Sequence, residues 1–242
     1  MPSYQERTYR RRVTSTDLVS FHVAVKETDL WISADANLEK EARDLVFDCR
    51  QQIETYIRIH PEFVVSLTPY QFDPLAPAVV KKMIDVTGRV GVGPMASVAG
   101  VIAQYVAEGL LGLTDQVIVE NGGDIFLKTN RPATVSIFAG ASVLSDRIGL
   151  KISVRQMPLG VCSSSAKVGH SRSIGKTDVC CILSHCAALA DGAATAIGNM
   201  VKCKGDLKTI DRWVAQLPEI IGGVVIVGDS IAAWGDIELI DL

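Results

Sequence analysis

The sequence predicts an α+β fold in which two similar halves meet near residue 130. Short runs rich in β-branched residues, typical of strands, flank longer segments in which apolar residues recur at helical spacing. The order strands, helices, strands occurs twice along the chain, although no sequence repeat accompanies it. We therefore expect residues 1–242 to form one domain of two pseudo-repeat halves, with mainly antiparallel neighbouring strands.

The first half is expected to run from strands through helices to strands. Its clearest helix covers residues 38–57 and ends before Pro61, because apolar side chains recur every three or four positions. Those side chains are Leu38, Ala42, Leu45, Val46, Cys49, Ile53, Tyr56 and Ile57. The other expected elements are strands at 21–25 and 28–32 with segment 7–13 beside them, helices at 77–86 and 95–111, and strands at 116–120 and 124–128.

The second half is expected to repeat this order. It comprises strands at 134–139, 150–155 and 179–183, helices at 187–201 and 207–216, and strands at 223–227 and 231–234. The polar, Ser- and Gly-rich stretch 160–178 is expected to be a loop. It contains Gly175-Lys176-Thr177 but is not a phosphate-binding P-loop, because five residues separate Gly169 from Gly175 and a strand follows.

The composition supports a globular protein and excludes several classes. The chain is 48% hydrophobic and 21% charged, and its net charge of −3 argues against a general nucleic-acid-binding protein. The basic cluster Arg7, Arg10, Arg11 and Arg12 is interpreted as a solvated strand. No signal peptide or membrane-spanning run is visible, so we expect a cytoplasmic protein. The six cysteines form no C-x-x-C pair and are expected to be reduced.

Two stretches carry residue types suited to chemistry. Glu120-Asn121-Gly122-Gly123-Asp124 is either a hairpin turn or a place where a flat ligand lies on bare backbone. In Ala190-Asp191-Gly192-Ala193-Ala194-Thr195-Ala196, Asp191 and Thr195 share a helix face and offer oxygen ligands of the kind that Mg²⁺ or Ca²⁺ binds. The small residues between them are expected to leave that face open to a ligand. Alternatively, Asp191 only stabilises its helix, because an acidic residue near a helix N-terminus interacts favourably with the helix dipole.

These two stretches, together with Ser163-Ser164-Ser165, resemble the ApbE-like superfamily, whose best-known members are Mg²⁺-dependent FAD:protein FMN transferases. The whole chain is similar to a family of short bacterial and archaeal ApbE-like proteins. Further matching stretches are Lys26-Glu27-Thr28-Asp29-Leu30, Gly91-Val92-Gly93-Pro94-Met95 and Val168-Gly169-His170-Ser171. The resemblance covers nearly all of the sequence and implies a duplicated T-fold-like architecture, in agreement with the element order.

The resemblance implies a set of site residues. In the transferases a Gly-Gly-Asp turn lies at the flavin site, which corresponds to Asn121, Gly122, Gly123 and Asp124 here. Their Ala-Asp-x-x-x-Thr helix holds Mg²⁺ against the diphosphate of FAD, which corresponds to Asp191 and Thr195. The edge of their Ser-Gly loop corresponds to Ser163, Ser164 and Ser165. The implied cofactors are therefore Mg²⁺ and FAD or FMN.

The chain also departs from the transferase pattern. The transferases follow the Ser-Gly loop with His-x-x-Asp-Pro-x-x-Gly, and this segment is absent here. They also have Lys-Gly near the start of the central helix, where this chain has Ala99-Gly100. His170 matches no position of the missing segment. We therefore expect a site for a flavin or another nucleotide diphosphate, without FMN transfer.

Two other functions stay open at this point. Cys162 is expected in the polar loop with Lys167 and His170 nearby, where a cation would lower the thiol pKa and allow nucleophilic or persulfide chemistry in sulfur metabolism. Cys162 and His170 are thus the candidate catalytic residues. The third alternative is a binding protein without catalytic activity that is built on an enzyme fold. The expected partners are a small nucleotide or flavin and, through strand edges, a second copy of the chain, but no nucleic acid or membrane.

Overall fold

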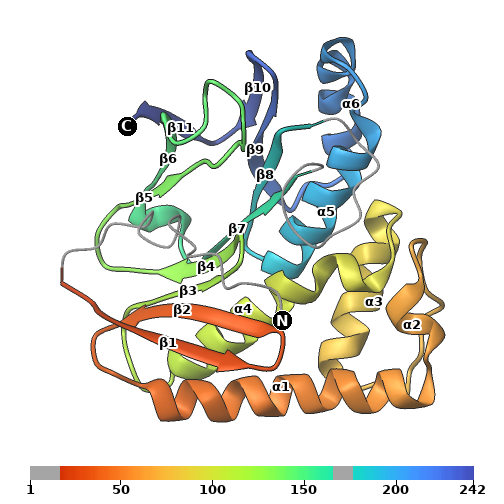
Figure 1. Cartoon of the computed structure of the whole chain (residues 1–242), viewed down its shortest axis with the longest axis vertical. Coiled ribbons are helices and arrows are strands. Elements are labelled where there is room, and N and C mark those ends of the chain that lie inside the picture. The colour runs from red at the N-terminus through yellow and green to blue at the C-terminus, as the bar shows by residue number, and fades with distance from the viewer. Residues whose placement is uncertain (1–16, 166–176) are drawn as a thin grey trace.

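An eight-stranded antiparallel sheet forms the centre of the computed structural model, which describes residues 17–165 and 177–242 (Figure 1). The strands lie in the order β1-β2-β3-β4-β7-β8-β9-β10. They are β1 (Val19–Val25), β2 (Thr28–Ala34), β3 (Val117–Asn121), β4 (Asp124–Lys128), β7 (Leu159–Ser164), β8 (Val179–Ser184), β9 (Ile220–Val227) and β10 (Ser230–Gly235). Short turns join β1 to β2, β3 to β4 and β9 to β10, whereas helices lie between β2 and β3 and between β8 and β9 along the chain.

Helices cover one face of this sheet and a smaller sheet covers part of the other (Figure 1). The helices are α1 (Glu39–Ile59), α2 (Glu62–Val65), α3 (Ala78–Val90), α4 (Val98–Leu110), α5 (Ala187–Met200) and α6 (Ile210–Val214), with 3₁₀ helices η2 (Pro94–Ser97), η3 (Val154–Gln156) and η4 (Lys204–Thr209). The smaller sheet contains β5 (Ala133–Ser136), β6 (Ile148–Ile152) and β11 (Glu238–Asp241) in the order β11-β6-β5. Two apolar cores result, one on each face.

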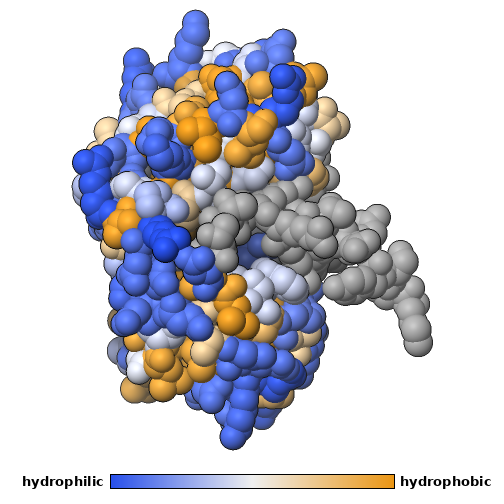
Figure 2. All heavy atoms as spheres, turned by 90° about the vertical axis from the view of Figure 1, so that its left-hand side faces the viewer, coloured by the Kyte–Doolittle hydropathy of each residue, from blue (hydrophilic) through white to orange (hydrophobic). Residues whose placement is uncertain are grey.

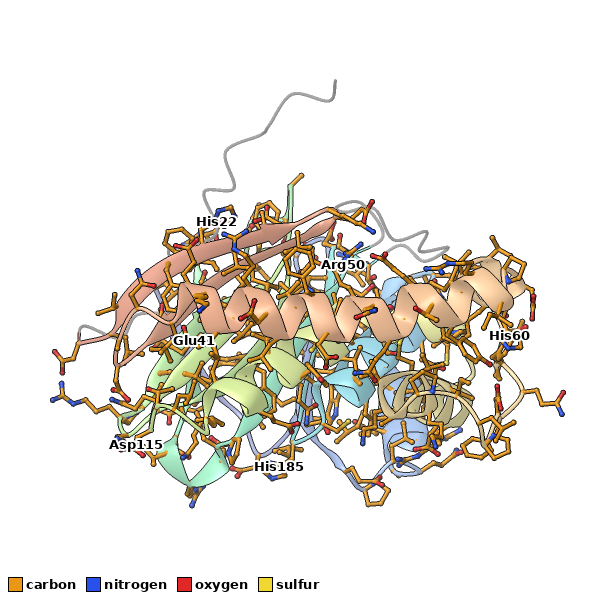
Figure 3. The ribbon with its side chains drawn as sticks, turned by 90° about the horizontal axis from the view of Figure 1, so that it is seen from below. His22, Glu41, Arg50, His60, Asp115 and His185 are labelled. Carbon is orange, nitrogen blue, oxygen red and sulfur yellow. The ribbon has the colours of Figure 1, made fainter. Side chains whose placement is uncertain are left out.

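Helix α1 follows directly from its sequence. The buried side chains Ala42, Val46, Cys49, Ile53 and Tyr56 recur at helical spacing and form the apolar face that packs against the other helices and β1. Viewed from below, α1 runs along the underside of the molecule with its polar face outward (Figure 3). The predicted helix at 38–57 is confirmed.

Helix α5 lies at the centre of the helical layer, in contact with α3, α4, β7 and β8. Its small residues allow these neighbours to approach closely. A Cβ added to Gly100 of α4 would lie 2.5 Å from the carbonyl oxygen of Ala187 in α5, and one added to Gly160 of β7 would lie 2.6 Å from the Cα of Ala187. Both distances are shorter than real Cβ contacts, so only glycine fits at either position.

The strand order places the two halves edge to edge. In the first half, β1 and β2 precede helices α1 to α4, and β3 and β4 follow them; in the second, β7 and β8 precede α5 and α6, and β9 and β10 follow them. The halves join where β4 pairs with β7 through Ile125↔Val161, Phe126↔Gly160 and Leu127↔Leu159. The predicted α+β class with its two strands-helices-strands halves is confirmed. That residues 1–242 form one domain stays a prediction.

The structure differs from the sequence expectation at several elements. Residues 159–164 form strand β7, although the stretch from 160 onward was expected to be a loop. The serines and Gly160 in this strand weaken the β pattern, but α5 covers it and requires the glycine. Strand β11 was not expected, and residues 204–214 form η4 and the short α6 rather than one longer helix. The expected strand at 7–13 lies outside the described residues.

Within the described ranges, no single helix has both the length and the apolar composition to cross a membrane, although α3 and the η2–α4 segment pass that test together with a bend of 101° between them. Both segments contribute side chains to the helix-side core. The face of the molecule shown in Figure 2 carries hydrophilic and apolar residues in a mixture.

Candidate functional site

A tight hairpin turn begins the site. Strand β3 ends at Asn121 and strand β4 begins at Asp124, its partner across the hairpin, with Gly122 and Gly123 between them. Gly122 has a φ of +75°, a conformation that favours glycine, and no atom lies within 4 Å of its Cβ position. Asn121 donates a hydrogen bond from Nδ2 to the carbonyl oxygen of Ala99 at 3.1 Å, which ties the turn to the start of α4. The hairpin interpretation of this stretch is confirmed.

Asp124 is buried beside this turn. Its side chain is 7% exposed, and Oδ1 accepts a hydrogen bond from the backbone N–H of Ser163 in β7 at 3.2 Å. The Cys162 thiol also lies within hydrogen-bond reach of the carboxyl group. Burial raises the pKa of Asp124 to about 7, and these two hydrogen bonds counteract only part of the effect.

Asp191 of α5 caps a different helix. Helix α4 has no side-chain cap of its own, and Oδ2 of Asp191 accepts a hydrogen bond from the N–H of Gly100 in its first turn at 2.9 Å. The N–H of Ala99 interacts with the same carboxyl group. A carboxylate at this position satisfies N–H groups that the helix leaves unpaired and interacts favourably with its dipole. The 8% exposed Asp191 is therefore part of the fold as well as of the candidate site.

The two carboxyl groups influence each other although 67 positions separate them in the sequence. Burial raises the pKa of Asp191 well above its ordinary value, and the negative charge of Asp124 raises it further. Within the described part of the chain, no Lys or Arg forms an ion pair with either carboxyl group. We call this pair, with the Asn121–Asp124 turn and Ser163, the Asp124–Asp191 site. The raised pKa values favour the neutral forms of both carboxyl groups, and a cation between them would favour the ionised forms.

The expectation for Cys162 was wrong in two respects. Cys162 lies in β7 rather than in an open loop, and its side chain is fully buried, with Sγ 3.3 Å from the carbonyl oxygen of Ala187. Burial raises the pKa of its thiol, and the neighbouring carboxyl groups of Asp124 and Asp191 raise it further. We expected cations to lower the pKa of the Cys162 thiol, whereas burial and the two carboxyl groups raise it. Lys167 and His170 lie outside the described residues.

The expectation of an open face on α5 was also wrong. Of the residues from Ala190 to Ala196, only Thr195 is half-exposed and the others are buried. The small side chains serve helix packing instead, as the contact between Gly192 and the side chains of Val90 and Thr87 illustrates. Thr195 follows Asp191 by one turn, as predicted, and its hydroxyl forms no hydrogen bond within the described residues.

The predicted serines lie at the end of β7. Ser163 is half-buried and Ser164 is buried, and the backbone of Ser163 lies in van der Waals contact with the Cβ position of Gly123. Ser163 and the Gly-Gly turn are thus brought together although they are far apart in sequence. Sequence reasoning missed the participation of Ala99 and Gly100, which hold Asn121 and Asp191. Their signal was the cluster of small residues at the start of α4, where Ala99-Gly100 was noted only as a departure from the Lys-Gly of the transferases.

The residue types at the site are compatible with Mg²⁺. Among residues 17–165 and 177–242, no three His, Cys, Asp or Glu side chains form a ready metal cage. Mg²⁺ commonly binds through only one or two carboxylates together with water and substrate phosphates. Asp124, Asp191 and the Thr195 hydroxyl provide oxygen ligands of this type.

Comparison with known proteins identifies the family. The model of the family described as AbpE bacteria matches residues 10–218. The chain belongs to this family. Among the relatives of this chain, a UPF0280 protein from Methanocella arvoryzae is 38% identical to it over 212 residues, which cover 87% of this chain and 86% of the relative. A UPF0280 protein from Methanosarcina barkeri is 39% identical over 220 residues, 89% of this chain and 86% of its own.

Solved structures confirm the fold of this AbpE bacteria family member. The flavin transferase ApbE from Vibrio cholerae matches with a TM-score of 0.59 at 15% identity, over 90% of this chain and 96% of its own. The apo flavinyl transferase ApbE from Pseudomonas stutzeri matches with a TM-score of 0.57 at 14% identity, over 90% and 93% of the two chains. The ApbE-like resemblance predicted from the motifs is therefore confirmed, and at this identity it extends to the fold alone.

Proposed function

We propose that this protein binds a flavin or another nucleotide diphosphate together with Mg²⁺ at the Asp124–Asp191 site. The observation that supports this most strongly is the burial of two carboxyl groups beside a Gly-Gly turn without a bonded Lys or Arg in the described residues. Two neighbouring buried carboxylates are costly unless a cation offsets their charge. The similarity in fold to solved structures of flavin transferases supports a flavin as the first ligand to test.

Each group has a distinct role in the proposed complex. Asp191 and Thr195, one helical turn apart, would hold the cation, and Asp124 would add a second carboxylate. The backbone of Gly122 and Gly123 would contact the flat part of the ligand, while the hydroxyls of Ser163, Ser164 and Ser165 would donate to phosphate oxygens. Bound Mg²⁺ would neutralise the charge of the diphosphate.

Calorimetric titration of FAD, FMN and ADP with and without Mg²⁺ tests the proposal. We expect FAD or ADP to bind the wild type about tenfold more tightly with Mg²⁺. Asp124→Asn and Asp191→Asn should abolish this enhancement, whereas Asp85→Asn, on the exposed face of α3, should retain it. Circular dichroism checks that Asp191→Asn still folds, since Asp191 caps α4. An enhancement of equal size in both site variants, or no binding of any of the three ligands, would overturn the proposal.

The other two functions gain less support. Thiol chemistry at Cys162 requires access and a thiolate, and the observed burial of this residue disfavours both. A binding role without catalysis is compatible with the same site and is distinguished by turnover assays of the bound ligand. Location in the cytoplasm and self-association stay predictions.

A further inference from the structure

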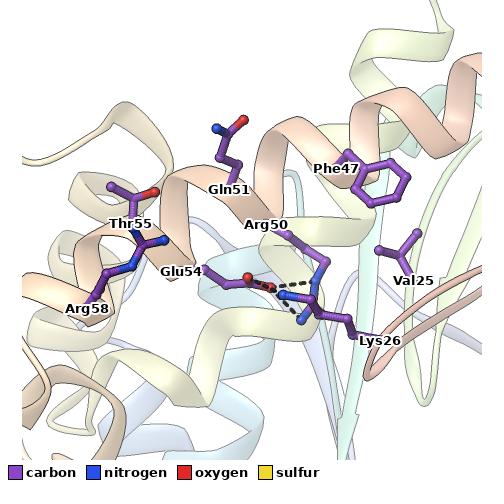
Figure 4. Close-up of a pocket in the computed structure, with 8 residues that line it drawn as sticks. All are labelled: Val25, Lys26, Phe47, Arg50, Gln51, Glu54, Thr55 and Arg58. Atoms are coloured by element: carbon purple, nitrogen blue, oxygen red, sulfur yellow. Dashed lines mark hydrogen bonds and ion pairs between the residues drawn. The ribbon is translucent and has the colours of Figure 1, made fainter.

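A cavity lies between α1 and the turn that joins β1 to β2, and it shares no residue with the Asp124–Asp191 site (Figure 4). Its volume is about 220 Å³. The α1 residues that line it follow one helical stripe, and the β1–β2 turn closes its side. The lining residues are Phe47, Arg50, Gln51, Glu54, Thr55 and Arg58 from α1, with Val25 from the end of β1 and Lys26 from the turn.

Positive charge exceeds negative charge around this cavity. Lys26, Arg50 and Arg58 line it, whereas Glu54 is the single carboxylate of the lining set. Glu54 accepts hydrogen bonds from both Lys26 and Arg50, with an Arg50 Nη2 to Oε1 distance of 2.7 Å. Glu27 pairs with Arg50 from the rim, but it is 84% exposed and is screened by water. Even when Glu27 is counted, one positive charge remains.

Arg58 carries that charge. It lies four residues after Glu54 on the helix, yet within the described residues it forms no ion pair or hydrogen bond. Helical side chains lean toward the N-terminal turn, which brings the Arg58 guanidinium beside Thr55 (Figure 4). Arg58 is exposed, so water accepts from its five N–H donors, and an anion can take the place of that water.

The opposite end of the cavity is apolar. The ring of Phe47, 54% exposed, lies near the side chain of Val25. The combination of spare cationic donors and an exposed ring matches a ligand with an anionic group at one end and an apolar ring at the other. The volume is below the roughly 300–1,000 Å³ of sites for drug-sized ligands, so the ligand has a single ring and is smaller than a dinucleotide.

We propose that the cavity lined by Lys26, Phe47 and Arg58 binds a small aromatic anion, with its phosphate or carboxylate on Arg58 and Lys26 and its ring on Phe47. The ion group of Arg50, Glu54 and Thr28 holds the floor of this cavity in place. Arg50 is only 13% exposed and donates to the buried Thr28 hydroxyl at 2.6 Å, which fixes the turn against α1. This assignment does not depend on the function proposed above.

Calorimetric titration of the full chain at low ionic strength tests the assignment with phenyl phosphate, benzoate and inorganic phosphate. We expect phenyl phosphate or benzoate to bind saturably, and the tighter of the two identifies the preferred anion. Arg58→Gln should weaken that binding about tenfold. Phe47→Ala should weaken it while leaving the affinity for inorganic phosphate unchanged. The matched control is Arg43→Gln, because Arg43 lies on the same helix, pairs with Glu39 and does not line the cavity.

Thermal unfolding checks that these surface variants fold like the wild type. Absence of saturable binding to the wild type would overturn the assignment, and so would an equal loss in Arg43→Gln. Loss of binding in Asp124→Asn with full binding in Arg58→Gln would also overturn it, because the anion would then occupy the Asp124–Asp191 site. Failure of the flavin titrations leaves these outcomes unaffected.

Discussion

The carboxyl groups of Asp124 and Asp191 oppose folding when they are ionised. Both are almost fully buried, and each receives backbone hydrogen bonds that offset only part of the cost of removing its charge from water. The local chemistry therefore depends on the protonation state and on whether a cation is present.

We expect the protein without metal to lose stability as the pH rises from about 4 to about 7. The pKa of Asp124 is raised from 3.8 to about 7, so between these values the folded state binds more protons than the unfolded state. The free energy of unfolding then falls with increasing pH, by about 4 kcal/mol from Asp124, and the raised pKa of Asp191 acts in the same direction. Urea unfolding at pH 5 and pH 8 measures the difference. Asp124→Asn should reduce it, because only Asp191 then contributes, and a rise in stability over this range would contradict the assignment.

Thiol reactivity should follow burial rather than sequence neighbours. Cys203 is exposed and Cys186 is half-buried, whereas Cys49, Cys162, Cys180 and Cys181 are buried. We expect an alkylating reagent to label Cys203 first and Cys162 only after unfolding, because burial and adjacent carboxyl groups raise the pKa of the Cys162 thiol. Peptide mass mapping against time gives the order. Fast labelling of Cys162 in the folded protein would restore the sulfur-chemistry hypothesis.

At the scale of elements, glycine sets the distance between α4 and α5. Gly100→Ala would place a Cβ 2.5 Å from the Ala187 carbonyl oxygen and 2.9 Å from the Asp191 Cβ. We expect a loss of about 1–3 kcal/mol in the free energy of unfolding, because backbone must shift. Gly88→Ala is the matched control in α3, where nothing lies within 4 Å and the substitution should stabilise by up to about 1 kcal/mol. Equal effects of the two substitutions, measured by urea unfolding, would contradict this account.

The elements that the sequence predicted well are those with strong periodicity. Helix α1 and the hairpin β3–β4 were expected within a few residues of their observed ends, because their apolar spacing and turn residues act locally. Strand β7 was missed since its polar composition is tolerated only under the cover of α5, a contact between distant segments. For the same reason the motifs indicated which residues carry chemistry, but not that Asp191 is buried as a cap of α4.

At the scale of the whole molecule, the chain shares the ApbE fold but lacks one transferase segment. The His-x-x-Asp-Pro-x-x-Gly sequence is absent from residues 1–242. We therefore expect no transfer of FMN to a threonine of an acceptor domain in the presence of FAD and Mg²⁺. Mass spectrometry of the acceptor, with and without this protein, provides the measurement. An added FMN mass that requires the protein would show that other residues perform the transfer.

The pairing of β4 with β7, which we call the seam, lies beside the Asp124–Asp191 site. Only three Cα pairs join the two halves there, and the Asp124 carboxylate extends the seam by accepting the Ser163 N–H. Asp124 belongs to the first half and Asp191 to a helix of the second, so a cation held by both carboxylates would link the two halves. An occupant that binds only the closed seam lowers the population of every state in which β4 and β7 separate. Hydrogen exchange at β4 and β7 would then slow when a ligand is bound, so the stability of the contact between the halves would depend on the ligand.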